Sequence, residues 1–231
     1  MEIGQDGLMN KSKIKKNIEI LYLDNHIMVI NKKNGLLTQD SGTGKVNLED
    51  LARDYIKYET NKIGNVFLHA CHRLDKDVSG IVLFARTSKA LKRLSNKDSQ
   101  EKMNKTYHAI VSGDLPIYSG KLENYILHDN HKSKISTSKN RRAKKAILKF
   151  KVLEKISCGT KLEIILLTGR YHQIRIQLSN FGYPIIGDQK YGSKYSFNGI
   201  GLHHYKFSFY HPVKDEFMSI KAPYPKNNIW L

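Results

Sequence analysis

The sequence predicts an α+β fold with a mixed, largely antiparallel central sheet and flanking helices and loops. Short β-prone runs outnumber helix-like segments, and most successive runs are separated by turns short enough for hairpins. The chain has 231 residues, of which 40% are hydrophobic and 26% charged, which is enough for a substantial core. No repeat, low-complexity linker or boundary interrupts residues 17–231, so we expect one folded domain there.

The β-prone runs show either apolar alternation or a short continuous apolar stretch. Two of them flank the turn Asp24-Asn25-His26 and predict a hairpin. The run from Lys161 to Thr168 is more apolar than most, so we expect it to lie centrally in the sheet. In chain order the predicted strands occupy residues 18–23, 27–30, 81–85, 105–111, 148–152, 161–168, 205–209 and 217–220.

Three segments have the apolar spacing and the end signals of helices. Asn47 can cap the first helix and Thr87 or Ser88 the second, because their side-chain oxygens accept hydrogen bonds from free backbone amides. The third helix begins near Gln173 and is expected to end at Gly182, a residue type that suits a helix C-cap. We expect these helices to flank the sheet.

The net charge of +18 and the pI of about 9.7 predict a polyanionic partner. Lysine and arginine side chains that neutralise phosphates release counterions, which gives affinity for nucleic acid without sequence preference. A membrane surface fits less well, because the sequence has no basic amphipathic helix with a broad apolar face. Nucleic acid is therefore the predicted partner, and a general lysine-rich composition is the alternative explanation of the charge.

Two segments are notably basic. Residues 1–16 are polar, end in several lysines and are expected to form a flexible basic arm. Residues 128–145 are the most basic part of the chain and include Arg141 and Arg142. We expect a mobile hairpin or loop that lies on nucleic-acid phosphates there; a charged face that contacts only water is the alternative.

The sequence shows no signal for export, membrane insertion or cofactor binding. No apolar run is long enough to cross a bilayer, so we expect a cytoplasmic protein with no membrane partner. Cys71 and Cys158 form no Cys-x-x-Cys pair and are expected to be reduced thiols. Phosphate-loop, dinucleotide and serine or cysteine nucleophile motifs are all missing, so no cofactor is expected.

The strongest candidate for chemistry is the stretch from His72 to Gly80, which runs directly into the apolar residues 81–85. Its Ser-Gly end predicts a turn, so Asp75 would lie in a loop at the mouth of a buried strand, two residues after Arg73. Loops on a rigid scaffold commonly carry catalytic groups. The alternative is that Asp75 is a turn or cap residue and Arg73 a surface cation.

A second junction between a strand and a loop contains Arg170 and His172. If one sheet brings the two junctions together, Arg170 can pair with Asp75, and the guanidinium would keep the carboxylate ionised and oriented. An ionised carboxylate in a cleft can act as a nucleophile or a base at a sugar carbon. A purely structural buried salt bridge would use the same two residues.

A metal site is the rival interpretation of this region. His69, His72, His203 and His204 could in principle bind a metal together with Asp75. Their spacing matches no common metal signature, and a His-x-x-His pair in a loop does not favour one. We therefore expect no metal.

Beside the stretch from His72 to Gly80, six other segments carry short motifs: residues 18–37, Lys105-Thr106-Tyr107, residues 167–175 with the pattern Thr-Gly-Arg-x-His-Gln-Ile-Arg, residues 184–188, Leu202-His203 and His211-Pro212. These motifs resemble, in the same order, those of the RluA-like family of RNA pseudouridine synthases, and the stretch from His72 to Gly80 is similar to the family signature. The resemblance covers about residue 17 to the C-terminus. Several ordered motifs are much more specific than one short match.

The resemblance implies the pseudouridine synthase fold, with a catalytic cleft across the sheet, and a cofactor-independent isomerase that acts on uridines in structured RNA. It implies that Asp75 is the catalytic aspartate, that Arg170 pairs with it, and that Tyr107 packs against the target base and can assist removal of the C5 proton. Arg73 would fill the gap left by a flipped nucleotide. The residues expected to bind RNA are Arg73, Lys105, His172, Arg141 and Arg142.

The chain departs from the usual family motifs at a few positions that remove no catalytic group. Val78 and Tyr171 stand where threonine is common, and Lys33-Asn34 replaces a frequent Pro-Ala. The basic arm is too short for the S4-type RNA-binding domain of many relatives, so target selection would rest on the catalytic domain.

The resemblance leaves several choices open. We expect a monomer that acts on large-subunit ribosomal RNA or transfer RNA. Nucleophilic attack at C1′ and proton abstraction at C2′ are both compatible with an aspartate. A metal-dependent nuclease and a non-catalytic RNA-binding module are the rival functions.

Overall fold

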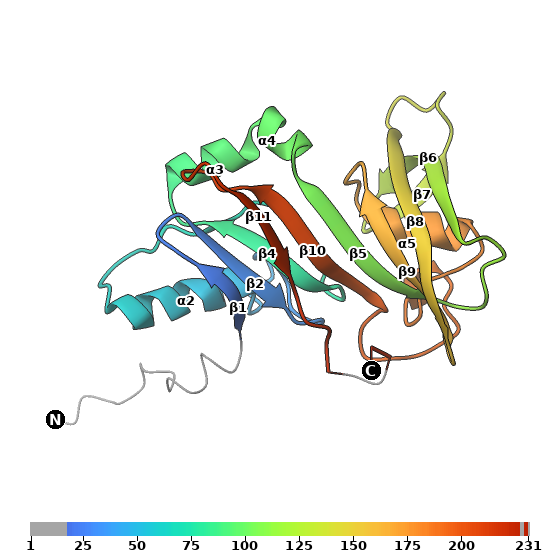
Figure 1. Ribbon diagram of the computed structural model, residues 1–231, viewed down its shortest axis with the longest axis horizontal. Helices are drawn as coiled ribbons and strands as arrows, with labels where there is room; N and C mark the ends of the chain where they lie inside the picture. The colour runs from blue at the N-terminus through green and yellow to red at the C-terminus, as the bar shows by residue number, and fades with distance from the viewer. Residues whose placement is uncertain (1–17, 227–228, 231) are drawn as a thin grey trace.

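The computed structural model describes residues 18–226, 229 and 230. Within these residues eleven strands form one sheet, in the order β1-β2-β4-β10-β5-β9-β8-β6-β7, with β11 paired to β10 and β3 paired to β4 (Figure 1). Among these strands only β4 and β10 pair in parallel. The predicted α+β fold with a mixed, largely antiparallel sheet is confirmed. The predicted basic arm, residues 1–16, lies outside the described residues.

The helices and strands alternate in short segments along the chain. The strands are β1 (Glu19–Leu23), β2 (Ile27–Lys32), β3 (His69–Ala70), β4 (Ser79–Ala85), β5 (Asn104–Val111), β6 (Ser119–Asp129), β7 (Lys132–Ser136), β8 (Lys144–Ile156), β9 (Gly159–Leu166), β10 (Leu202–Tyr210) and β11 (Phe217–Lys221). The helices are α2 (Leu48–Thr60), α3 (Ser88–Ser95), α4 (Lys97–Glu101), α5 (Gln173–Asn180) and the short 3-10 helix η1 (Gln189–Tyr191).

The two faces of the sheet support separate cores. Successive side chains of a strand point to opposite faces. Met28 and Ile30 therefore join a core with α2, whereas Ile27 and Val29 join a second core with α3. Figure 1 shows α2 and α3 on opposite sides of this half of the sheet. All four side chains are fully buried, and each such burial contributes roughly 1.5–3 kcal/mol.

Helix α5 covers the same face of the sheet as α2, but at its other half. Ile174 and Leu178 of α5 belong to the core that also contains Leu48 and Leu51 of α2. Leu74 and Val78, on either side of Asp75 in the loop that precedes β4, belong to the same core. The loop of Asp75 therefore packs on the face of the sheet that both helices cover.

The predicted N-caps of α2 and α3 are correct, and the predicted C-cap of α5 differs from the observed one by one residue. The side chains of Asn47 and Thr87 accept backbone hydrogen bonds at the starts of α2 and α3, as predicted. The C-cap of α5 is Phe181 and not Gly182. Gly182 follows it with φ +94°, the left-handed conformation for which glycine is favoured, so the glycine lies just beyond the cap.

The basic segment 128–145 is more regular than predicted. It contains the end of β6, all of β7 and the start of β8, and β6 pairs with both of the others. Part of the segment forms a hairpin, which agrees with the prediction of a hairpin or loop: strand pairing includes residues 128–129, 132–136 and 144–145, and residues 137–143 connect β7 to β8. Strand β6 was not predicted, since most of its side chains are exposed or half-buried.

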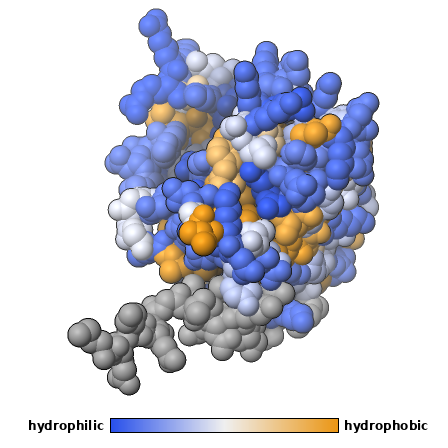
Figure 2. Space-filling view, turned by 90° about the vertical axis from the view of Figure 1, so that its left-hand side faces the viewer, coloured by the Kyte–Doolittle hydropathy of each residue, from blue (hydrophilic) through white to orange (hydrophobic). Residues whose placement is uncertain are grey.

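The described part of the chain has a largely polar exterior. Figure 2 shows that hydrophilic residues cover most of one face of the molecule and that hydrophobic residues form small patches on it. None of the helices in the described residues combines the length and the apolar character needed to cross a membrane. Cys71 and Cys158 are free thiols, as expected.

Candidate active site

The loop that carries Asp75 is fixed on both sides of that residue. Thr38 Oγ1 accepts a hydrogen bond from the backbone amide of Leu74 (3.1 Å) and donates one to its carbonyl (3.0 Å). On the other side, the carbonyl of Lys76 accepts from the backbone amide of Gly35 (2.9 Å). Asp75 is therefore held between two backbone anchors.

The buried side chain of Lys32 also holds this loop, through hydrogen bonds to backbone carbonyls. Lys32 is 1% exposed, and its Nζ donates to the carbonyls of Lys33, Leu36 and Lys76 at 2.7–3.0 Å. Burial lowers the pKa of Lys32 to about 7, although the charge of nearby Asp75 favours its protonated form. The Lys32 side chain thus connects β2 to the residue that follows the candidate catalytic aspartate.

The loop ends where β4 approaches β10 very closely. Gly80 has φ +112°, and a Cβ atom built on it would lie 2.4 Å from the carbonyl oxygen of His204. Only glycine therefore permits the parallel pairing of Gly80 with His204. This pairing brings the end of the Asp75 loop next to the strand that pairs with β5.

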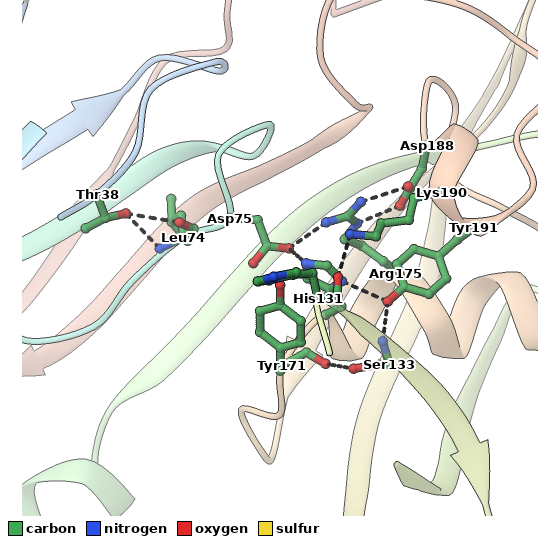
Figure 3. A network of polar contacts seen from close by, with 11 residues as sticks. Thr38, Leu74, Asp75, His131, Ser133, Tyr171, Arg175, Asp188, Lys190 and Tyr191 are labelled. Atoms are coloured by element: carbon green, nitrogen blue, oxygen red, sulfur yellow. Dashed lines mark hydrogen bonds and ion pairs between the residues drawn. The ribbon is translucent and has the colours of Figure 1, made fainter. Parts of the chain in front are cut away.

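The carboxylate of Asp75 contacts a buried guanidinium (Figure 3). Arg175 Nη1 donates to Asp75 Oδ2 at 2.9 Å, while Nε and Nη2 of the same arginine donate to the two oxygens of Asp188 at 2.7 and 2.9 Å. Burial alone would lower the pKa of Arg175, but the hydrogen bonds and charges of Asp188 and Asp75 raise it. Arg175 is thus a permanent cation fixed between two carboxylates.

The predicted pairing of Arg170 with Asp75 is wrong. The Arg170 side chain is exposed, and its Nε donates to the carbonyl of Lys145 at 3.0 Å. The chain turns after Arg170 so that α5 begins at Gln173, and the first turn of this helix directs Arg175 toward Asp75. Arg170 still borders the cavity described below, but at its rim.

His172 is the second contact of Asp75. Its Nε2 lies 3.4 Å from Asp75 Oδ2, and its Nδ1 lies 2.8 Å from the hydroxyl of Tyr191, which accepts from the amide of Ser133. The backbone of His172 is left-handed, with φ 51°, a conformation that is uncommon outside glycine and often found at functional sites. Burial lowers the pKa of His172 to about 3, and the charge of Arg175 adds to this, so the ring is neutral.

Asp75 opens onto a cavity of about 1040 Å³. Tyr107 from β5 borders this cavity and is 7% exposed. Burial raises the pKa of Tyr107 far above its usual value, and the charge of Asp75 acts in the same direction, so the phenol stays protonated. Lys105, two residues earlier on the same strand, also borders the cavity, and burial lowers its pKa.

The structure places the predicted RNA-binding residues in two groups. Arg73, Lys105 and His172 border the cavity together with Asp75 and Tyr107, and Arg73 is exposed there. Arg141 and Arg142 are exposed in the segment that joins β7 to β8, and they are not among the residues that border this cavity.

Two of the histidines considered as metal ligands use their Nδ1 atoms in other contacts. His203 Nδ1 bonds the hydroxyl of Ser79 at 2.8 Å, and His204 Nδ1 bonds the carbonyl of Ile81 at 2.7 Å. Across the residues that the structure describes, no three His, Cys, Asp or Glu side chains gather as metal ligands.

Sequence reasoning gave no role to Arg175, Asp188, Thr38 and Lys32. Arg175 lies in the first turn of α5, but His172 precedes this helix as its N-cap and has a left-handed backbone, so helical periodicity does not relate the two side chains. Asp188 and Lys32 reach the site through contacts between distant segments, for which the sequence contains no local signal. Thr38 is likewise identified only by its contact with Leu74.

Comparison with known proteins gives the same class of protein as the motifs. The family model described as RNA pseudouridylate synthase matches residues 26–180, which is more than half of the chain. The chain is 35% identical over 220 residues to an uncharacterised RNA pseudouridine synthase, YhcT, of Bacillus subtilis, with 90% of this chain and 69% of that protein covered. It is 31% identical to ribosomal large subunit pseudouridine synthase C of Buchnera aphidicola, with 90% and 67% covered.

A solved structure shows the same fold. The human RNA pseudouridylate synthase domain containing 4 aligns with a TM-score of 0.77 at 22% identity, covering 93% of this chain and 91% of that one. The chain belongs to the RluA-like family of RNA pseudouridylate synthases. It is an RNA pseudouridine synthase, an isomerase that modifies RNA.

Proposed function

We propose that this enzyme converts uridines of large-subunit ribosomal RNA into pseudouridine, and that Asp75 acts on the ribose of a flipped-out nucleotide. The observation that carries the proposal is the carboxylate of Asp75, held by Arg175 and His172 at the wall of a cavity that Tyr107 also borders. The choice of ribosomal over transfer RNA rests on relatives named ribosomal large subunit pseudouridine synthases C and D.

The reaction breaks the bond between C1′ and N1 and forms one between C1′ and C5; C5 loses a proton and N1 gains one. Both contacts of Asp75 involve Oδ2, so Oδ1 has no hydrogen bond from any described residue and is the oxygen available to the ribose. From this position the carboxylate can attack C1′ or take the C2′ proton. Arg175 holds the carboxylate in place through its hydrogen bond to Oδ2 in either case.

Tyr107 offers its ring to the detached uracil. Its raised pKa keeps the phenol neutral, so Tyr107 acts by stacking and by hydrogen bonding and not as a phenolate base. A nucleotide inside an RNA helix cannot reach Asp75, so it must leave the stack. The exposed Arg73 guanidinium at the edge of the cavity suits the vacated space, because a planar cation can both stack and contact phosphate.

The test is to map pseudouridines in cells with and without the gene, and in cells that carry only Asp75→Asn. We expect sites in large-subunit ribosomal RNA to disappear without the gene and to stay absent with Asp75→Asn, with at least a 1000-fold lower rate in vitro. Asp77→Asn in the same loop is the matched control and should keep most sites. Loss confined to transfer RNA would refute the proposed substrate, and restoration by Asp75→Asn would refute the role of Asp75.

A further inference from the structure

A buried histidine lies directly behind the tyrosine of the active site. The rings of His204 and Tyr107 are nearly parallel, with an interplanar angle of 15° and 4.4 Å between their centroids. The two residues face each other in the register of β10 and β5. Tyr107 borders the cavity, whereas His204 is fully buried and does not, so the imidazole covers the face of the phenol that points away from the cavity.

The imidazole of His204 is itself rigidly held. Its Nδ1 lies 2.7 Å from the carbonyl of Ile81, which can only accept, so Nδ1 carries a proton. The edges of the rings of His72 and Phe207 pack around it, with centroids 5.4 Å away. These contacts leave the plane of the His204 ring little freedom to change.

The second ring nitrogen of His204, Nε2, makes no hydrogen bond to a described residue that would offset its burial. Nε2 is completely buried and has no hydrogen-bond partner among the residues that the structure describes. An unsatisfied buried acceptor costs about 1–3 kcal/mol, and an apolar side chain of similar size would avoid that cost. Apolar packing alone therefore does not account for the imidazole, whose one hydrogen bond in the described part of the chain is that of Nδ1 to Ile81.

We propose that His204 is a positioning residue, which fixes the plane of the Tyr107 ring against which the uracil turns before it rejoins the ribose. The reacting base is released and must present C5 to C1′, so a small error in the ring that guides it is costly; misplacements of about 1 Å can lower rates about 100-fold. This inference rests on the proposed role of Tyr107. His204 itself does not touch the RNA.

The test compares aromatic and non-aromatic replacements of His204. The substrate is total RNA labelled with [5-³H]uridine from cells that lack the gene, because pseudouridine formation releases the tritium at C5. Enzyme in excess gives the maximal single-turnover rate and the enzyme concentration at half-maximal rate. We expect His204→Leu and His204→Met to lower the maximal rate about 10–100-fold, with the half-maximal concentration unchanged within about 2-fold. His204→Phe, which keeps a ring behind Tyr107, should stay within about 5-fold of wild type.

Two controls separate positioning from a general loss of packing. The first control is His108→Leu. His108 is a buried histidine of β5 that stacks on Tyr205 with 4.0 Å between the ring centroids, and it does not border the cavity. The maximal rate of this variant should match wild type. Thermal unfolding of each variant shows that it is folded at the assay temperature. A wild-type rate for both non-aromatic variants, or an equal loss for the leucine and phenylalanine variants, would overturn the proposal.

A double-mutant cycle tests whether His204 acts through Tyr107. In a Tyr107→Leu background, His204→Leu should change the maximal rate by less than about 2-fold, since the ring that it positions is gone. A full additional loss would show that His204 acts elsewhere. The Tyr107→Leu variant alone tests the proposed role of the tyrosine, so failure of that role is visible without any change at His204.

Discussion

The ion pairs around Asp75 in the candidate active site and the basic hairpin β6–β7 use charge in opposite ways. In the site, Asp75, Arg175 and Asp188 are paired at 2.7–2.9 Å, and the arginine is buried. In the hairpin and the segment after it, cationic side chains such as Lys134 and Arg141 are exposed. Removal of one partner of a buried ion pair costs much stability, because the other charge stays buried without compensation. Single exposed charges contribute little stability each, so the exposed cations matter mainly through their total charge.

The largest effect should come from the buried arginine. We expect Arg175→Ala to lower the single-turnover rate at least 100-fold and to lower the free energy of unfolding by about 3–5 kcal/mol, because Asp188 is left buried without its cation. Tritium release and urea unfolding measure the two effects.

Two further arginine variants sharpen this contrast. Arg175→Lys keeps the charge but lacks the planar fork that bonds both oxygens of Asp188 while it contacts Asp75, so it should retain only part of the rate. Arg170→Ala is the matched control and should stay within about 3-fold of wild type, since its side chain is exposed and bonds a carbonyl. Equal losses for Arg170→Ala and Arg175→Ala would contradict the pairing described here.

A smaller effect should appear in the pH dependence of stability. Burial lowers the pKa of His203 to about 4 and that of His204 to about 3, from a normal 6.5. Between these values the unfolded chain binds more protons than the folded one, so stability is lost as the pH falls from about 6.5 toward 4. Each histidine contributes a slope of up to about 1.4 kcal/mol per pH unit, which urea unfolding at several pH values measures.

Replacement of one histidine checks the origin of that slope. His204→Phe removes one titrating group and should flatten the loss of stability with acid by up to about 1.4 kcal/mol per pH unit. The same slope in wild type and His204→Phe would show that other groups dominate acid unfolding.

The smallest effect should come from the exposed arginines of the basic segment. Arg141→Ala and Arg142→Ala should each weaken RNA binding only about 2–5-fold at moderate salt and reduce the slope of log affinity against log salt by about one. The maximal single-turnover rate should not change, because neither residue borders the cavity. A loss of rate without a change in salt slope would place these residues in the chemistry instead.

The sequence predicted those parts of the fold that depend on neighbouring residues. The caps at Asn47 and Thr87 are local, and the position of Asp75 follows from the run of apolar residues that comes directly after its loop. Strand β6 was missed because its alternation is weak, with few buried side chains.

Contacts between distant segments set the limit of prediction at the site. Arg170 was chosen over Arg175 because the left-handed turn at His172, which decides the direction of the helix, leaves no local signal. The pairing of His204 with Tyr107 lies directly before a shift in the register of β10 and β5, between His204 and Lys206, and the sequence gives no signal for either.

The hydrogen bonds that hold the backbone around Asp75 limit how far this loop can change when substrate binds. Thr38 and Lys32 hold the backbone on both sides of the aspartate with hydrogen bonds that need no RNA. The loop of Asp75 is therefore preformed, and in the proposed reaction the change of shape falls on the nucleotide that leaves its stack. Uridines that are unpaired or next to a mismatch need less energy for such a step, so the proposal implies that the flexibility of the RNA contributes to the choice of target.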